Sequence, residues 1–211
     1  VRYSTMGDRL LANSQPLVIS SNKGQLALAH NGNLIKAHKL RDELENSGAI
    51  FQTTIDSEVI ASLIAKHSGD GIIEAVIKTM AELKGSYALV IMTPDMVIGV
   101  RDPKGIRPLA LGRIENSYVF ASESCAFDTI GAEFIRDLRP GEIVVADKNG
   151  LKSYQGMHAN DSALCIFEYV YFARPDSDID GIPVHKARER AGELLAMANN
   201  VDADVVAAVP D

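Results

Sequence analysis

The sequence predicts an α+β protein with layered sheets and helices on the outside, followed by the opening of an α/β domain. Helical apolar spacing dominates residues 34–83, and short strand-like runs separated by turn signals fill residues 87–154. Helices grouped before closely spaced strands favour antiparallel sheets covered by helices. We place the domain boundary at a composition change near residue 158, so that residues 1–158 form the first domain. Residues 159–211 are an interdomain segment and the beginning of the second domain.

Three helices follow the first apolar strand. The run Leu26–Leu34 begins as a small apolar strand and leads into the Asn31-Gly32 pair, which we expect to form a tight turn with Asn33 capping the next helix. Apolar residues three and four apart continue from there. The predicted helices run over 34–46, from a cap at Asp56 or Ser57 to Gly69, and over 71–83.

Strand-like runs then alternate with Pro, Gly and Asn turn signals, and their short spacing favours antiparallel hairpins. These runs are Tyr87–Met92, Met96–Val100, Tyr118–Ala121, Glu142–Ala146 and Leu151–Tyr154. A helix over 184–199 and a buried-type strand over 204–209 have the order of a parallel α/β unit. The chain opens with Val1–Thr5, which has the composition of a strand. Because a lone terminal strand would leave its ladder unpaired, we expect an interior fragment of a longer protein.

Composition narrows the class of protein. The 211 residues are 46% hydrophobic and carry 21 basic against 28 acidic side chains, with no basic run, so we expect no nucleic-acid partner. The apolar runs are shorter than the ~18 residues of a membrane helix, and no signal-peptide pattern is present. Two cysteines, Cys125 and Cys165, do not form a disulfide framework. A cytoplasmic protein without a membrane partner is the economical interpretation.

Four residues have the chemistry to bind a free amino acid. The Arg2 guanidinium suits a carboxylate, and the Asp56 carboxylate suits an ammonium group. The Asn31 amide and the Gly32 backbone N–H are donors that can hold a developing oxyanion. Individually, a strand arginine, an Asn-Gly turn and a capping aspartate have ordinary structural roles. Together they predict a site for an α-amino acid with a reactive side-chain carbonyl.

The order and spacing of several motifs resemble the class II glutamine amidotransferases. The motifs of the glutaminase domain are Arg2–Thr5, Ala29–Asn33, Asp56–Glu58 and Lys84–Tyr87. Those that resemble the amidophosphoribosyltransferase branch of the family are Asp102–Leu109, Ser122–Asp128 and Glu168–Ser177. The resemblance runs through essentially the whole chain.

This resemblance implies a four-layer αββα fold of the N-terminal-nucleophile hydrolases, truncated at its N-terminus, followed by the start of a phosphoribosyltransferase domain. Arg2 would bind the glutamine α-carboxylate, Asp56 its α-ammonium, and Asn31 and Gly32 would form the oxyanion hole. The family hydrolyses glutamine through a thioester and passes ammonia to phosphoribosylpyrophosphate, giving 5-phosphoribosylamine in the first step of purine synthesis. Mg²⁺ at the transferase site and a homo-oligomer are also implied.

The family nucleophile is an N-terminal cysteine, whereas position 1 here is Val1. We therefore expect no glutaminase turnover from these 211 residues alone. Cys125 is expected to be a small buried hydrophobe and not a substitute nucleophile. By the resemblance, Cys165 is one ligand of a [4Fe–4S] cluster whose other three ligands lie beyond Asp211.

Two alternatives remain open from the sequence. One is the glutaminase half of another class II enzyme, such as asparagine synthetase or glucosamine-6-phosphate synthase, although these do not carry the Cys165–Gly181 segment. The other is a non-catalytic binding module with the same fold. His30 is expected to position the Asn-Gly turn. A polar loop between the domains, interpreted as an interface, contains Arg174, Asp176, Ser177 and Asp180.

Overall fold

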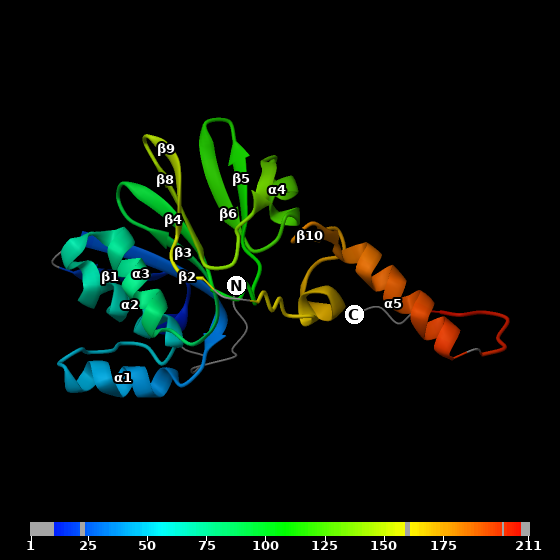
Figure 1. The fold of residues 1–211 in the computed structure, drawn as a ribbon, viewed down its shortest axis with the longest axis horizontal. Coiled ribbons are helices and arrows are strands. Elements are labelled where there is room, and N and C mark those ends of the chain that lie inside the picture. Colours follow the sequence, from blue (N-terminus) through cyan, green and yellow to red (C-terminus); the bar gives the residue numbers. More distant parts are fainter. Residues whose placement is uncertain (1–10, 22–23, 159–160, 200, 208–211) are drawn as a thin grey trace.

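A six-stranded antiparallel sheet forms the centre of the molecule (Figure 1). The computed structural model describes residues 11–21, 24–158, 161–199 and 201–207. The strand order is β1-β2-β3-β4-β8-β9. The strands are β1 (Leu17–Ser21), β2 (Gly24–Leu34), β3 (Gly85–Met92), β4 (Met96–Arg101), β8 (Glu142–Asp147) and β9 (Gly150–Gln155). The pairs β3–β4 and β8–β9 are the antiparallel hairpins predicted from the turn signals.

Three helices cover one face of this sheet (Figure 1). They are α1 (Ala37–Asn46), α2 (Asp56–His67) and α3 (Ile72–Glu82), and a 3-10 turn (Ser68–Asp70) links the last two. The helix α2 is buried along most of its length, and its apolar side chains pack with those of β2, β3 and β4 in one continuous core. The predicted second and third helices are thus confirmed.

A three-stranded sheet packs against the other face. It has the order β6-β5-β7, with β5 (Ala110–Ile114), β6 (Ser117–Ala121) and β7 (Glu133–Asp137). Leu111 and Val144 belong to the apolar cluster between the sheets, and the ring of Phe120 lies over Gly99, where a Cβ atom would collide with it. The two sheets therefore share a second core.

The short helix α4 (Cys125–Ile130) forms the outermost layer. Leu111 of β5 points to the core between the sheets, so the next residue, Gly112, faces outward. The ring of Phe127 from α4 lies against that outward face, at a place where any Cβ on Gly112 would meet it. The order helices, sheet, sheet, helix confirms the predicted four-layer αββα fold.

Three local predictions were wrong. The Asn-Gly pair lies inside β2 and not in a turn, because β3 pairs with β2 through Leu34. Asn33 therefore caps no helix; α1 begins at Ala37, after Lys36 in a left-handed conformation (φ 58°). Neither Asp56 nor Ser57 is the cap of α2, since Ile55 occupies that position and Asp56 is the first helical residue. Strands β1, β5 and β7 and helix α4 had no clear sequence signal.

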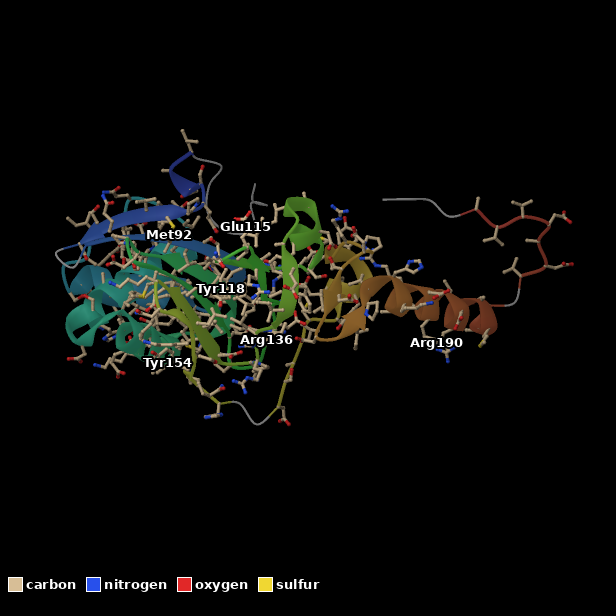
Figure 2. The ribbon with its side chains drawn as sticks, turned by 90° about the horizontal axis from the view of Figure 1, so that it is seen from above. Met92, Glu115, Tyr118, Arg136, Tyr154 and Arg190 are labelled. Atoms are coloured by element: carbon tan, nitrogen blue, oxygen red, sulfur yellow. The ribbon has the colours of Figure 1, made fainter. Side chains whose placement is uncertain are left out.

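The C-terminal part begins with a π-helical turn, Glu168–Phe172, and a two-stranded ribbon of β10 (Asp178–Ile179) and β11 (Ile182–Pro183). The helix α5 (Val184–Ala198), predicted from the sequence, extends away from the body, with Arg190 on it in Figure 2. Of its residues only Val184 is buried. The predicted strand over 204–209 does not form at 204–207, where none of the described residues supplies a neighbouring strand. The domain boundary at 158 stays a prediction.

Candidate functional site

Alternation along the end of β2 divides the candidate residues between two faces of the large sheet. Leu34 belongs to the core under the helices. Because side chains on a strand alternate between its two faces, His30, four residues earlier on β2, faces the same layer. Asn31 faces the other sheet, where its amide contacts the loop after β4 and the end of β6. The adjacent residues His30 and Asn31 therefore face opposite sides of the sheet and have different partners.

The backbone N–H of Gly32 lies on the edge of β2 that faces away from β3. The bond from Ile35 N–H to the carbonyl of Lys84 sets the ladder with β3, and in that ladder Gly32 is a non-hydrogen-bonded position whose N–H points away from β3. On that side β1 pairs with β2 only as far as Leu28. Among the described strands, none continues opposite Gly32, so none of them pairs with this N–H.

Side chains occupy the neighbouring donors on the same edge. His30 N–H donates to Gln15 Oε1 at 2.7 Å, and Leu34 N–H donates to Asp56 Oδ2 at 3.0 Å. Gly32 lies between them, two residues from each, which is ~7 Å along a strand. The structure therefore brings the Asp56 carboxylate and the Gly32 N–H to one edge.

Asp56 is held as a carboxylate. Its Oδ1 lies 3.7 Å from His30 Nδ1, which is also 3.2 Å from Ser57 Oγ. Burial acts to raise the pKa of Asp56, but the hydrogen bond and charge of His30 and the Leu34 N–H bond outweigh it, so this pKa lies below its usual value. An anionic, partly desolvated carboxylate suits an ammonium ligand. His30, expected to position a turn, instead positions this acid.

Gly32 has no room for a side chain. Its φ is +152°, and a Cβ atom on it would overlap the backbone carbonyl of Ser86 on β3. A glycine is required here because β3 approaches the backbone closely, and not because the pair forms a turn.

The Asn31 amide is fixed on both sides. Its Nδ2 donates to Ser122 Oγ at 3.1 Å, and its Oδ1 accepts from Arg107 Nη2 at 3.0 Å. Arg107 in turn pairs with Glu168 of the π-helical turn, at 2.7 Å. Sequence reasoning assigned no role to these three partners, although each lies within a motif noted above. Arg107 and Ser122 are 76 and 91 positions away from Asn31 in the sequence, and no regular spacing connects residues so far apart.

The convergence of Arg2, Asn31 and Asp56 on one hollow stays a prediction. Arg2 lies outside the described residues. The structure has a cavity of about 370 Å³ at the opposite end of β2, between the start of that strand, the end of α2 and the β3–β4 turn. Its lining includes Leu26, Ile64 and Met96 and none of the candidate residues.

The two cysteines lie in different surroundings. Cys125 is buried in α4, and burial raises the pKa of its thiol, as fits a small hydrophobe and not a nucleophile. Cys165 is partly exposed, and its N–H donates to the carbonyl of Ile106. Within the described part of the chain, no three His, Cys, Asp or Glu side chains are grouped to hold a metal ion. No described helix is long and apolar enough to cross a membrane.

Residues 2–129 match the family model of the glutamine amidotransferase domain, and the chain belongs to that family. Within it, the whole chain is similar to amidophosphoribosyltransferases. It is 50% identical over 214 residues to that of Archaeoglobus fulgidus and 49% identical over 213 residues to that of Bacillus subtilis, covering 100% of this chain and 47% and 44% of those proteins. The chain thus spans about half the length of these relatives.

The solved structures agree. Glutamine phosphoribosylpyrophosphate amidotransferase from B. subtilis, complexed with ADP and GMP, superposes with a TM-score of 0.91 at 45% identity, over 97% of this chain and 44% of that one. A structure described as the allosteric regulatory enzyme of purine biosynthesis gives 0.87 at 46% identity, over 91% and 42%. The chain has the fold of the glutaminase domain of these enzymes.

Proposed function

We propose that the complete protein is an amidophosphoribosyltransferase, which hydrolyses glutamine and transfers the ammonia to phosphoribosylpyrophosphate to give 5-phosphoribosylamine, the first step of purine synthesis. The observation that carries this proposal is the extent of the similarity. The glutamine amidotransferase model ends at residue 129, whereas the similarity to amidophosphoribosyltransferases covers the entire chain. Another glutaminase domain of the family would share only the first part.

The proposed glutaminase chemistry is acyl transfer. A thiolate attacks the side-chain carbonyl of glutamine, and negative charge develops on the carbonyl oxygen. Asn31 Nδ2 and the Gly32 N–H would donate hydrogen bonds to that oxygen. Stabilisation of such developing charge by fixed donors is usually the largest single contribution to catalysis. Support comes from the Gly32 N–H, which no described strand pairs with, and from the fixed Asn31 amide. We propose that the nucleophilic cysteine lies outside these 211 residues.

The substrate would be held at its zwitterionic end. Asp56 would bind the α-ammonium group, which its buried, charge-stabilised carboxylate supports. Arg2 would bind the α-carboxylate, by its place in the family motif. Binding of the α-ammonium and α-carboxylate groups would position the side-chain carbonyl of glutamine against the two donors, Asn31 Nδ2 and the Gly32 N–H.

We propose that Cys165 supplies one thiolate of a [4Fe–4S] cluster in the complete protein. Its partial exposure is compatible with that role, but a cluster needs four thiolates and the sequence has two cysteines, one of them buried in α4. The present residues therefore do not hold a cluster by themselves. Mg²⁺ bound with phosphoribosylpyrophosphate, a homo-oligomer and a cytoplasmic location are proposals from the family, although some plant relatives are named chloroplastic.

The test is a paired assay on the complete protein. With glutamine and phosphoribosylpyrophosphate, we expect glutamate and pyrophosphate to appear together. Asn31→Ala should lower glutamine-dependent product formation by about 100- to 1,000-fold and leave ammonia-dependent formation intact. Asn46→Ala, an exposed asparagine at the end of α1, is the matched control. Glutamate without pyrophosphate would indicate a different class II enzyme, and neither product would indicate a binding module.

A further inference from the structure

Arg107 joins the Asn31 amide to the π-helical turn Glu168–Phe172. It lies in the loop between β4 and β5 and reaches both partners with separate nitrogens of one guanidinium. Nη2 donates to Asn31 Oδ1 at 3.0 Å, and Nη1 lies 2.7 Å from Glu168 Oε1. The guanidinium carbon also lies over the ring of Phe172, 5.0 Å from the ring centroid, as a cation–π contact.

The chemistry of these groups sets which way the Asn31 amide points. A guanidinium carries only donors, so the side of the amide that faces Arg107 must be the oxygen. The Nδ2 group is then directed away from Arg107, where one hydrogen bonds to Ser122 Oγ. Its second hydrogen is the one that would be donated to the oxyanion in the proposed function. A flipped amide would place Nδ2 against the guanidinium and present an acceptor to the oxyanion.

The π-helical turn holds Arg107 in the required position. Glu168 is 3% exposed, and a carboxylate so buried needs a cationic partner. Glu168 and Phe172 come from one five-residue turn, and both contact the guanidinium of Arg107. The bond from Cys165 N–H to the carbonyl of Ile106 ties the two segments together next to Arg107. Two contacts with the guanidinium and one with the backbone next to Arg107 thus restrict this side chain.

We propose that Arg107 is a positioning residue for the oxyanion hole, which holds the Asn31 amide in its donor-facing orientation, and that Glu168 and Phe172 keep Arg107 in place. This inference rests on the proposed glutaminase function. It assigns part of the glutaminase geometry to the segment that follows residue 158, so that displacement of the π-helical turn would release the amide.

The experiment uses the complete protein and compares glutamine-dependent with ammonia-dependent activity, because ammonia bypasses the oxyanion hole. Arg107→Met should lower kcat for glutamine hydrolysis by about 100-fold, comparable to the loss of one oxyanion donor. KM for glutamine and the ammonia-dependent rate should change by less than about threefold, since neither depends on the donor. Arg107→Lys keeps the charge but not the fork, so we expect an intermediate loss of kcat. Glu168→Gln should give a smaller loss in the same direction.

The matched controls are Arg113→Lys and Glu133→Gln, which alter an exposed arginine–glutamate pair on the second sheet. Both should leave all rates unchanged. A glutaminase kcat for Arg107→Met within twofold of wild type, while Asn31→Ala is inactive, would overturn the proposal. So would a parallel loss of glutamine- and ammonia-dependent rates in Arg107→Lys and Glu168→Gln, which would show a purely structural role. A wild-type protein without glutaminase activity would instead refute the proposed function itself.

Discussion

Asp137, at the end of β7, should make the folded protein less stable at high pH. Burial raises the pKa of Asp137 from 3.8 to about 6, and the nearby carboxylate of Asp180 adds to this, while Arg101 opposes it. Because the pKa is higher in the folded than in the unfolded state, the contribution of the protonated Asp137 to the free energy of unfolding is complete below about pH 4. This contribution is lost as the pH rises through about 6. Replacement by asparagine removes this pH-dependent cost and keeps an acceptor for the Asp180 N–H.

The magnitude follows from the two pKa values. Because the Asp137 carboxyl ionises less readily in the folded state (pKa about 6) than in the unfolded state (3.8), its ionisation lowers the free energy of unfolding by about 1.6 kcal/mol at pH 5 and about 3 kcal/mol at pH 8, relative to the fully protonated group. These are upper values, because solvent reaches part of the side chain. The stability gained by Asp137→Asn should therefore grow by up to about 1.4 kcal/mol between pH 5 and pH 8.

Urea unfolding at both pH values measures this gain from the midpoint and slope. Asp42→Asn, on the exposed side of α1, removes the same charge and serves as the control; its effect should not grow with pH. If the gain from Asp137→Asn is equal at pH 5 and pH 8, or if it falls as the pH rises, the burial argument is refuted.

Two further predictions concern stability. Gly32→Ala should prevent normal pairing of β2 with β3, because the added methyl overlaps the Ser86 carbonyl; we expect a loss of at least about 3 kcal/mol in urea unfolding, and a stable variant with an unchanged midpoint would contradict this. Arg101 is fully buried and donates to Asp180 and to the carbonyls of three other residues. Arg101→Met should cost about 3–5 kcal/mol, because the carboxylate and these carbonyls lose their donors, and a melting temperature equal to wild type would show that the ion pair contributes nothing.

Local patterns predicted the helices well and the site motif only in part. The apolar spacing along α2 and α3 is an intrinsic property of the chain, because a helix buries side chains three and four apart whatever it packs against. The Asn-Gly pair also has a strong local preference, for a turn, and that prediction was wrong. Pairing of β2 with β3 through Leu34 overrides it, since backbone hydrogen bonds to a neighbouring strand outweigh a two-residue propensity.

The amino-acid sequence by itself determined the residue types of the candidate site and a layered α+β architecture, because ordered motifs and periodic apolar residues are visible without coordinates. The four-layer fold was implied by the resemblance of those motifs to the family. Only the tertiary structure decided how Asn31 and Asp56 are used. It directs the Asn31 amide to Arg107 on one face of the sheet and joins Asp56 to the backbone of Leu34 at its edge. Such contacts between residues far apart in the chain have no periodicity and no fixed spacing. They exist only once two sheets and a buried helix have packed together.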